Sequence, residues 1–364
     1  YKNWGWQYHE YAARVPESSI SAYVVIEQPE NAGDALQGIL ESVQFTLPEL
    51  SPPNVDPPMP EDGVPYEPTP GSVKAGKYTL KAEWIAQGPS IVLDSIFGNQ
   101  IAKTGDDLYV LAGKKLYAFG MKGNKLKPST KLDGGVMKLG DSFEALSAGS
   151  DGILYASQGI FNILAFKDGK QLQDNSVSGN LVMSPDGTWG ITSWANADTV
   201  RVTAKKGVLT GEPWVLTNLS DPEKRTGRFS SVSCMAITKD RVYVAGYDAE
   251  NNDAQRVAVY DLKGKELFSF GGLDWMQDDA FGSITGIVET KNGILVQDGN
   301  NRAYKLFTKD GAFIASVSAD ELLGTSYPWL SSMISTKDGI LVSAAQERQD
   351  QSCDELLIFR LSGF

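Results

Sequence analysis

The feature that most constrains the fold of this chain is a repeat that runs through residues 77–364. Each unit opens on an Asp or Asn turn, usually followed by Gly, and continues as two strands, the second of which commonly ends in an aliphatic–aromatic pair. Asp-Gly and Asn-Gly are strong hairpin signals because glycine accepts a positive φ without steric cost. The six turns begin at residues 106, 151, 186, 240, 292 and 338. Their spacing is close to the roughly 40–50 residues of a propeller blade, so the repeat predicts an all-β, six-bladed β-propeller.

The two ends of the repeat predict how the ring closes. The sixth unit has three strands before the sequence ends at Phe364, and residues 77–84 form a spare alternating strand ahead of the first unit. We expect that strand to become the outer strand of the sixth blade. Closure by strand exchange removes a strand edge that would otherwise invite aggregation.

One unit carries a more specific pattern. Residues 287–313 contain a hydrophobic–Asp–x–x–Asn–x–hydrophobic order around Asp298 and Asn301, and then the Asp-Gly-x-Phe ending at Phe313. This unit resembles the repeats of NHL-type six-bladed propellers, whereas the other units keep the turns and strands but lack the Asp…Asn-Arg element. The resemblance implies the architecture and little about activity, because one fold hosts many functions.

The first 47 residues differ in character from the repeat. Residues 19–26 predict a strand, residues 29–43 predict a helix whose apolar side chains follow one buried face, and residues 44–47 predict a short final strand. This order resembles the C-terminal end of PsbP/Mog1-like α/β domains. So short a segment needs the propeller rim or another chain to cover its helix, so we expect it to contact one of these.

A proline-rich linker joins this α/β segment to the propeller. Nine of the chain's 17 prolines fall within residues 48–70, and we place the linker at residues 48–76. Proline at this density favours extended polyproline II over helix or central strand. The linker is therefore either a semi-rigid spacer or a docking peptide for an aromatic-lined groove.

Composition excludes some kinds of partner and chemistry. The net charge of −12 disfavours nucleic acid and anionic lipid, because both repel an acidic surface. No apolar run approaches the ~20 residues of a transmembrane helix. The one histidine, His9, precedes the propeller, so His-based catalysis and His metal sites are not expected there. Cys234 and Cys353 fall two blades apart, and we expect two free thiols.

Aromatic residues occur in the loops that lead into the innermost strands, the face where propellers usually meet their ligands. The candidate binding residues combine these aromatics with two neighbouring carboxylates: Phe229, Trp275, Asp278, Asp279, Phe281, Tyr327 and Trp329. Exposed around one mouth, such rings would stack on sugars, peptides or a protein partner. The alternative is that the aromatics pack between blades and that the acidic loop is merely solvated.

A metal site at the channel is the enzymatic alternative. Calcium-dependent lactonases and esterases on six-bladed propellers hold a metal with Glu, Asn and Asp from inner strands, and this resemblance points to Asn99, Glu144 and Asn180. Glu144 is the only acid among the six aligned positions, and the other three blades offer Ser231, Thr285 and Ser332. A Ca²⁺ ion prefers six to eight oxygen ligands, so this set is short of charge.

These observations favour a non-enzymatic propeller of a bacterial cell envelope or surface that binds a protein or a glycan, with no resident cofactor and no catalytic residues. A Ca²⁺-dependent lactonase- or esterase-like hydrolase is the first alternative. A structural subunit of a surface assembly, with residues 1–47 as its contact arm, is the second.

Overall fold

The computed structural model describes two compact units, Tyr1–Asp56 and Pro57–Phe364. The described residues are 6–14, 21–29, 68–87, 91–93, 99–141, 143–149, 151–158, 162–193, 199–214, 229–249, 254–272, 277–325, 328–347 and 354–364.

The first unit contains an antiparallel hairpin. Strand β1 (Trp6–Arg14) pairs with β2 (Ser21–Pro29) in one continuous register. The predicted strand at 19–26 overlaps β2, but β2 continues to Pro29, the residue at which the sequence predicts a helix to begin. The rest of that helix and the strand at 44–47 lie outside the described residues, and β1 was not predicted.

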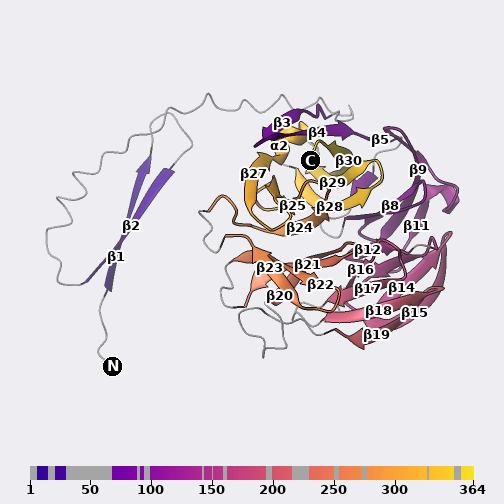
Figure 1. The fold of residues 1–364 in the computed structure, drawn as a ribbon. Coiled ribbons are helices and arrows are strands. Elements are labelled where there is room, and N and C mark those ends of the chain that lie inside the picture. The colour runs from indigo at the N-terminus through magenta and orange to yellow at the C-terminus, as the bar shows by residue number, and fades with distance from the viewer. Residues whose placement is uncertain are drawn as a thin grey trace. The chain divides into compact units, whose positions relative to one another are not determined.

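The second unit is a ring of six β-sheets, each a blade, drawn in Figure 1. Blades 2 to 5 are four-stranded antiparallel sheets. Their strands are β12 (Ala145–Ala148), β13 (Leu154–Ser157), β14 (Asn162–Lys167), β15 (Lys170–Ser178), β16 (Asn180–Met183), β17 (Trp189–Ser193), β18 (Thr199–Lys205), β19 (Val208–Pro213), β20 (Phe229–Ile237), β21 (Arg241–Asp248), β22 (Gln255–Asp261), β23 (Glu266–Phe270), β24 (Ile284–Glu289), β25 (Ile294–Asp298), β26 (Ala303–Phe307) and β27 (Phe313–Ser318).

Blades 1 and 6 each gain extra strands at the junction of the ring. Blade 1 contains β7 (Gln100–Thr104), β8 (Asp107–Ala112), β9 (Lys115–Lys122) and β10 (Lys125–Pro128), with β5 (Ala86–Gln87) and β11 (Val136–Lys138) beside them; the short helix η1 (Asp133–Gly135) precedes β11. Blade 6 contains β28 (Trp329–Thr336), β29 (Gly339–Glu347), β30 (Asp354–Ser362), β4 (Tyr78–Trp84), β3 (Ser72–Ala75) and β6 (Ile91–Leu93).

The second strand of each blade is largely buried, because neighbouring blades cover both its faces. In β8 the run Leu108–Ala112 is buried throughout, and in β25 all of Ile294–Asp298 is buried. Such strands form continuous apolar runs rather than alternating ones, and each fully buried Leu or Ile side chain contributes about 1.5–3 kcal/mol. Burial between blades therefore holds the ring together.

Strand exchange closes the ring as the sequence predicts. Strand β4 pairs antiparallel with β30, so that Leu361 faces Ala82, and β3 then pairs with β4 at the outer edge. Figure 1 shows β3 and β4 beside β30. Because β3 belongs to this sheet, the propeller begins within the segment that we had placed in the linker.

The chain leading into β3 is tied to a helix inserted between blades 5 and 6. Helix α2 (Ala319–Leu323) is capped by the Ser318 hydroxyl, which accepts from the Glu321 amide. The amide of Gly71 donates to Leu322 O at 3.0 Å, and the amide of Thr69 donates to Gly324 O at 3.2 Å. Among the described residues, no helix has the length and apolarity needed to span a membrane.

Candidate functional site at the mouth of the channel

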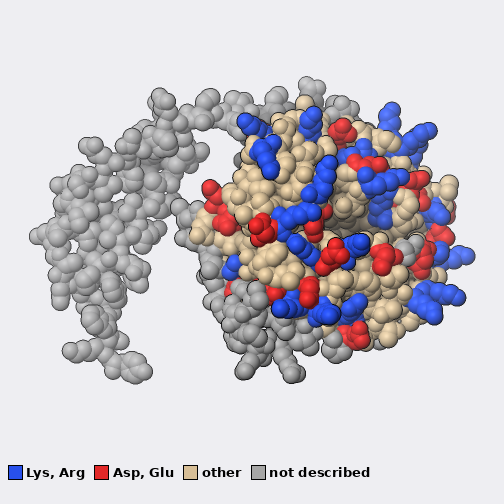
Figure 2. Space-filling model, viewed as in Figure 1, with Lys and Arg blue, Asp and Glu red and all other residues tan. Residues whose placement is uncertain are grey.

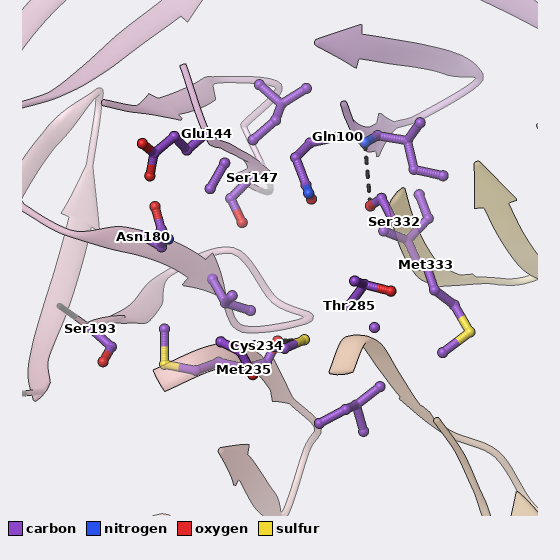
Figure 3. Close-up of a pocket in the computed structure, with 18 of the residues that line it drawn as sticks. Gln100, Glu144, Ser147, Asn180, Ser193, Cys234, Met235, Thr285, Ser332 and Met333 are labelled. Carbon is purple, nitrogen blue, oxygen red and sulfur yellow. Dashed lines mark hydrogen bonds between the residues drawn. The ribbon is translucent and has the colours of Figure 1, made fainter. Parts of the chain in front are cut away.

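The innermost strands β7, β12, β16, β20, β24 and β28 surround a central channel. A cavity of about 660 Å³ opens where these strands begin, and we call it the cup. Every blade contributes polar side chains to it: Gln100, Glu144, Ser147, Gln158, Asn180, Ser193, Ser233, Thr285 and Ser332. Figure 3 shows most of these side chains gathered around one space. The cup is thus walled by hydroxyls and amides with a single carboxylate among its described residues.

The floor of the cup is apolar. Each inner strand contributes at least one aliphatic or Met residue that lines both the cup and a second cavity of about 480 Å³ further along the channel: Ile101, Leu146, Val182, Met235, Ile287, Met333 and Ile334. These seven residues mark the level at which the two cavities meet, and we call them the apolar floor. A ligand that enters the cup therefore meets hydrogen-bonding groups on the wall and hydrocarbon at the bottom.

Hydroxyls of the wall also join neighbouring blades. The Ser147 Oγ accepts from the Met183 amide of the next blade at 3.1 Å, and the Ser332 Oγ accepts from the Ile101 amide across the closure at 3.5 Å. Within blade 5, the Thr285 Oγ1 accepts from the Gln297 side-chain amide at 3.0 Å. Each of these oxygens already accepts a hydrogen bond, and its own O–H proton can be donated to a ligand. These three hydroxyls are therefore fixed in place and biased towards donating, whereas the Ser233 hydroxyl already donates to Ala245 O at 3.3 Å.

Glu144 and Asn180 form the acceptor side of the wall. They begin β12 and β16, the inner strands of adjacent blades, and Figure 3 shows the amide oxygen of Asn180 directed toward the Glu144 carboxylate. Glu144 is exposed, while Asn180 Oδ1 is enclosed and has no hydrogen-bond partner among the described residues. Two acceptor oxygens facing one another repel unless a donor or a cation joins them.

Cys234 also lines the cup and is a free thiol, whereas Cys353 lies outside the described residues. Burial raises the pKa of the Cys234 thiol to about 12. The thiolate is the nucleophilic form, so a thiol with this pKa is a poor nucleophile at neutral pH. Cys234 therefore acts as part of the wall.

The aromatic residues predicted to bind a ligand fall into different environments. Phe229 and Phe281 are 4% and 6% exposed and pack into the cores between blades, so they are not available at the surface. Trp329, which begins β28, is 49% exposed. Trp275 and Tyr327 lie outside the described residues. The structure thus presents one of the three described aromatics at the surface.

The acidic loop serves a structural contact through its backbone. Asp278 is exposed and Asp279 is half-buried. The buried Lys305 ammonium donates to Asp278 O at 3.0 Å and also to Ala280 O. Its counter-charge is the fully buried Asp298, whose Oδ2 lies 3.6 Å from Lys305 Nζ. The loop is therefore held from beneath by a buried ion pair.

Two of the three predicted metal ligands meet in the cup. Glu144 and Asn180 lie in its wall, whereas Asn99 is 1% exposed and is not one of the residues that line it. Within the described ranges, no group of three or more His, Cys, Asp or Glu side chains is placed to hold a metal ion. The cup thus offers one carboxylate and one amide oxygen at the predicted position.

Sequence reasoning missed that the polar wall is itself the feature shared by all blades. A polar residue stands two positions before the floor residue in Glu144-x-Leu146, Asn180-x-Val182 and Thr285-x-Ile287. In β20, Ser233 lines the cup where Ser231 was expected, because register shifts on both sides of Ser231 displace the alignment. A polar–x–aliphatic pattern, which Ser233-x-Met235 also follows, was therefore the available signal.

The surface around the channel is of mixed charge. The face in view in Figure 2 is hollowed near its middle, and Lys and Arg side chains are interspersed with Asp and Glu around the hollow. Neither sign of charge dominates the described part of this face.

No protein-family model matches the chain, and no curated protein matches it. Among solved structures, the chain is similar to the β-propeller domain of Cps50 (Swd1) from Myceliophteria thermophila, with a TM-score of 0.45 and 10% identity over 75% of this chain and 98% of that one. The fold described above rests on the strand order and register of the six blades.

Proposed function

We propose that this propeller is a binding module whose partner inserts a small part of itself into the cup. The observation that carries the proposal is the composition of that cavity, in which all six blades supply polar groups above an apolar floor. Concave sites that combine apolar surface with a few fixed polar groups are typical of specific binding. The Ser147 and Ser332 hydroxyls are already held by hydrogen bonds between blades, and the Thr285 hydroxyl by one within its blade, so little side-chain freedom is lost when a ligand arrives.

We propose a protein partner in preference to a glycan. The described residues lining the cup include no aromatic side chain, whereas sugar rings are commonly recognised by stacking on aromatic faces. Hydroxyl donors above a hydrocarbon floor suit a peptide segment, which offers carbonyl acceptors and an apolar side chain together. The exposed Trp329 supplies an additional anchor at the start of an inner strand.

A calcium-dependent hydrolase is the second candidate. The observation that favours it is the pair of facing oxygens on Glu144 and Asn180, which a cation would join. Against it, one carboxylate and one amide supply few of the six to eight oxygens that Ca²⁺ takes. Water would have to complete the coordination, which predicts weak binding.

We further propose that the module acts in the cell envelope or outside the cell, joined to the first unit by the proline-rich linker. The chain combines a closed propeller, a linker with nine prolines and the appended β1–β2 hairpin. A proline-rich segment of this kind is typical of a semi-rigid spacer between two modules. A role for residues 1–47 as a contact arm is the corresponding structural alternative.

Thermal unfolding in the presence of candidate ligands tests the proposal. A ligand that binds only the folded state raises Tm in proportion to its concentration relative to Kd. We expect blocked peptides to raise Tm and neutral oligosaccharides to have no effect. The contrary result is that calcium chloride alone raises Tm, that Glu144→Gln abolishes this rise, and that the exposed Asp141→Asn does not. That result would favour the metal site over the binding module.

A further inference from the structure

We infer that the partner presents a Lys or Arg side chain to the cup, with its cationic group between Glu144 and Asn180 and its neighbouring apolar atoms on the floor. The inference rests on the proposed function and adds to it the chemistry of the partner. It follows from three properties of the cup: its unbalanced charge, its pair of facing acceptors and the separation of polar wall from apolar floor.

The first property is the charge. Glu144 is exposed, and the described residues that line the cup include neither Lys nor Arg. The carboxylate therefore stands in a concave site without a counter-charge, in which the surrounding walls screen it less than open solvent does. A cation that enters the cup is attracted to this position more strongly than to an isolated surface carboxylate.

The second property is the geometry of the acceptors. Asn180 Oδ1 is directed toward the Glu144 carboxylate and lacks a hydrogen-bond partner among the described residues. An enclosed acceptor without a partner destabilises the site, and an ammonium or guanidinium group can donate to both residues at once. Charge-assisted hydrogen bonds to a carboxylate are roughly twice as strong as neutral ones. A basic side chain therefore relieves both the repulsion and the missing hydrogen bond.

The third property is the arrangement in depth. Glu144 and Asn180 each stand two residues before a floor residue, Leu146 and Val182, so the acceptors lie above hydrocarbon. Lys and Arg carry an apolar stem of three or four methylenes, which favours contact with such surface. On the other side of the cup, the hydroxyl oxygens of Thr285 and Ser332 accept hydrogen bonds from Gln297 and Ile101, and their O–H protons can be donated to peptide carbonyls. A small inorganic cation would use the acceptors but leave the floor and these donors unused.

The test compares blocked peptides of one length that differ at one position. We propose Ac-Ala-Lys-Ala-NH₂, Ac-Ala-Arg-Ala-NH₂, Ac-Ala-Gln-Ala-NH₂ and Ac-Ala-Glu-Ala-NH₂, titrated by NMR into the full chain, into Glu144→Gln and into the control Asp141→Asn. Both substituted residues are exposed, so both variants should fold. We expect the Lys and Arg peptides to bind about tenfold more tightly than the Gln peptide, since tenfold corresponds to one charge-assisted contact.

The same titrations separate failure of the inference from failure of the proposed function. The inference is supported if the preference for Lys and Arg peptides is lost in Glu144→Gln and kept in Asp141→Asn. Added salt should also weaken this preference. Equal binding of all four peptides at the cup, unchanged in Glu144→Gln, would overturn the inference and leave the binding module standing. Absence of any shift at cup residues would overturn both. If Ca²⁺ displaces the Lys peptide and also raises Tm, Glu144 and Asn180 bind a metal ion instead of a basic side chain.

Discussion

Phe359 and Trp84 face each other in the antiparallel ladder between β30 and β4, although they lie near opposite ends of the propeller sequence. Leu361 of the same strand is 1% exposed, and Leu80 of β4 packs in the same cluster. Ring closure therefore depends on a strand that precedes the first blade, and its removal would uncover both this apolar surface and the hydrogen-bonding edge of β30.

Two truncations test this closure. Removal of residues 1–67 keeps β3, β4 and the hydrogen bonds from Thr69 and Gly71, so Tm should not change. Removal of residues 1–85 deletes the outer strands of blade 6, and we expect a lower Tm together with aggregation. Thermal unfolding and light scattering measure both effects. Equal Tm for the two truncations would mean that β4 does not hold the ring closed.

The buried ion pair in blade 5 gives a second prediction. Asp298 Oδ1 accepts from the amides of Gly282 and Ser283 at 3.1 and 3.0 Å, Asn301 donates to Oδ2 at 2.8 Å, and Lys305 neutralises the charge. Asp298→Asn would leave the Lys305 ammonium buried without its counter-charge, which typically costs about 3–5 kcal/mol.

The control for this substitution is an ion pair at the surface. Lys131 and Asp168 lie 3.2 Å apart with about half of each side chain exposed, so Asp168→Asn should cost less than ~1 kcal/mol. Urea unfolding of the two variants measures the difference. A free energy of unfolding lowered equally by both substitutions would contradict a structural role for the Asp298–Lys305 pair.

A third prediction concerns two glycines with similar backbone conformation and different surroundings. Gly324 and Gly113 have φ of +64° and +55°. A Cβ at Gly324 would lie 1.9 Å from Thr69 O, whereas nothing lies within 4 Å of a Cβ at Gly113. Gly113→Ala should therefore cost only the left-handed strain of about 1–2 kcal/mol, and Gly324→Ala should cost more. If urea unfolding shows that both substitutions lower the free energy of unfolding equally, the backbone at Thr69 can move away from the new Cβ without loss of stability.

Buried tyrosines give a prediction about alkaline pH. Burial, with Asp107 and Asp151 nearby, raises the pKa of Tyr109 and of Tyr155 respectively to about 12. Burial and the hydrogen bond to Glu289 raise the pKa of Tyr243 further. Unfolded tyrosine loses its proton near pH 10, so between pH 10 and 12 the unfolded chain binds fewer protons than the folded one. Stability should therefore be retained below pH 10 and fall as the pH rises through this interval.

Ultraviolet absorbance of tyrosinate measures this directly. In native protein, part of the tyrosine signal should appear only above the pH at which the chain in urea is fully ionised. Coincident titration curves for native and unfolded protein would contradict the burial of these hydroxyls.

Much of the fold could be predicted from the sequence because its signals are local. Turn residues such as Asp151 and Asn292 mark the hairpins, and the alternation in 77–84 marks a strand that no other blade needs. The Asp298…Asn301 pattern was recognised as a repeat element, and the structure supplies its reason: Asp298 binds the backbone of the loop leading into β24. Helix α2 was not predicted, because five residues are too few to show the 3.6-residue apolar repeat of a helix.

The site was harder to predict because the loop aromatics and the cup use different sets of residues. The Phe281 ring packs beside Phe270 and Phe307, with ring centroids 6.4 and 5.6 Å away. Burial of this apolar ring is more favourable than its exposure at the mouth of the channel. The cup instead uses small polar residues such as Ser147 and Thr285, which are common in any sequence. Their significance depends on closure of the ring, which brings six separate strands to one axis.

The central claim is that ligands bind in the cup, and methionine methyl NMR tests it most directly. Met235 and Met333 belong to the apolar floor, whereas Met121 and Met137 lie in blade 1 and do not line either channel cavity. With ¹³C-methyl methionine and Ac-Ala-Lys-Ala-NH₂ as the probe, we predict saturable shifts of the Met235 and Met333 signals and none of the Met121 and Met137 signals. Shifts confined to Met121 or Met137, or no shift at Met235 and Met333 at any peptide concentration, would contradict binding in the cup.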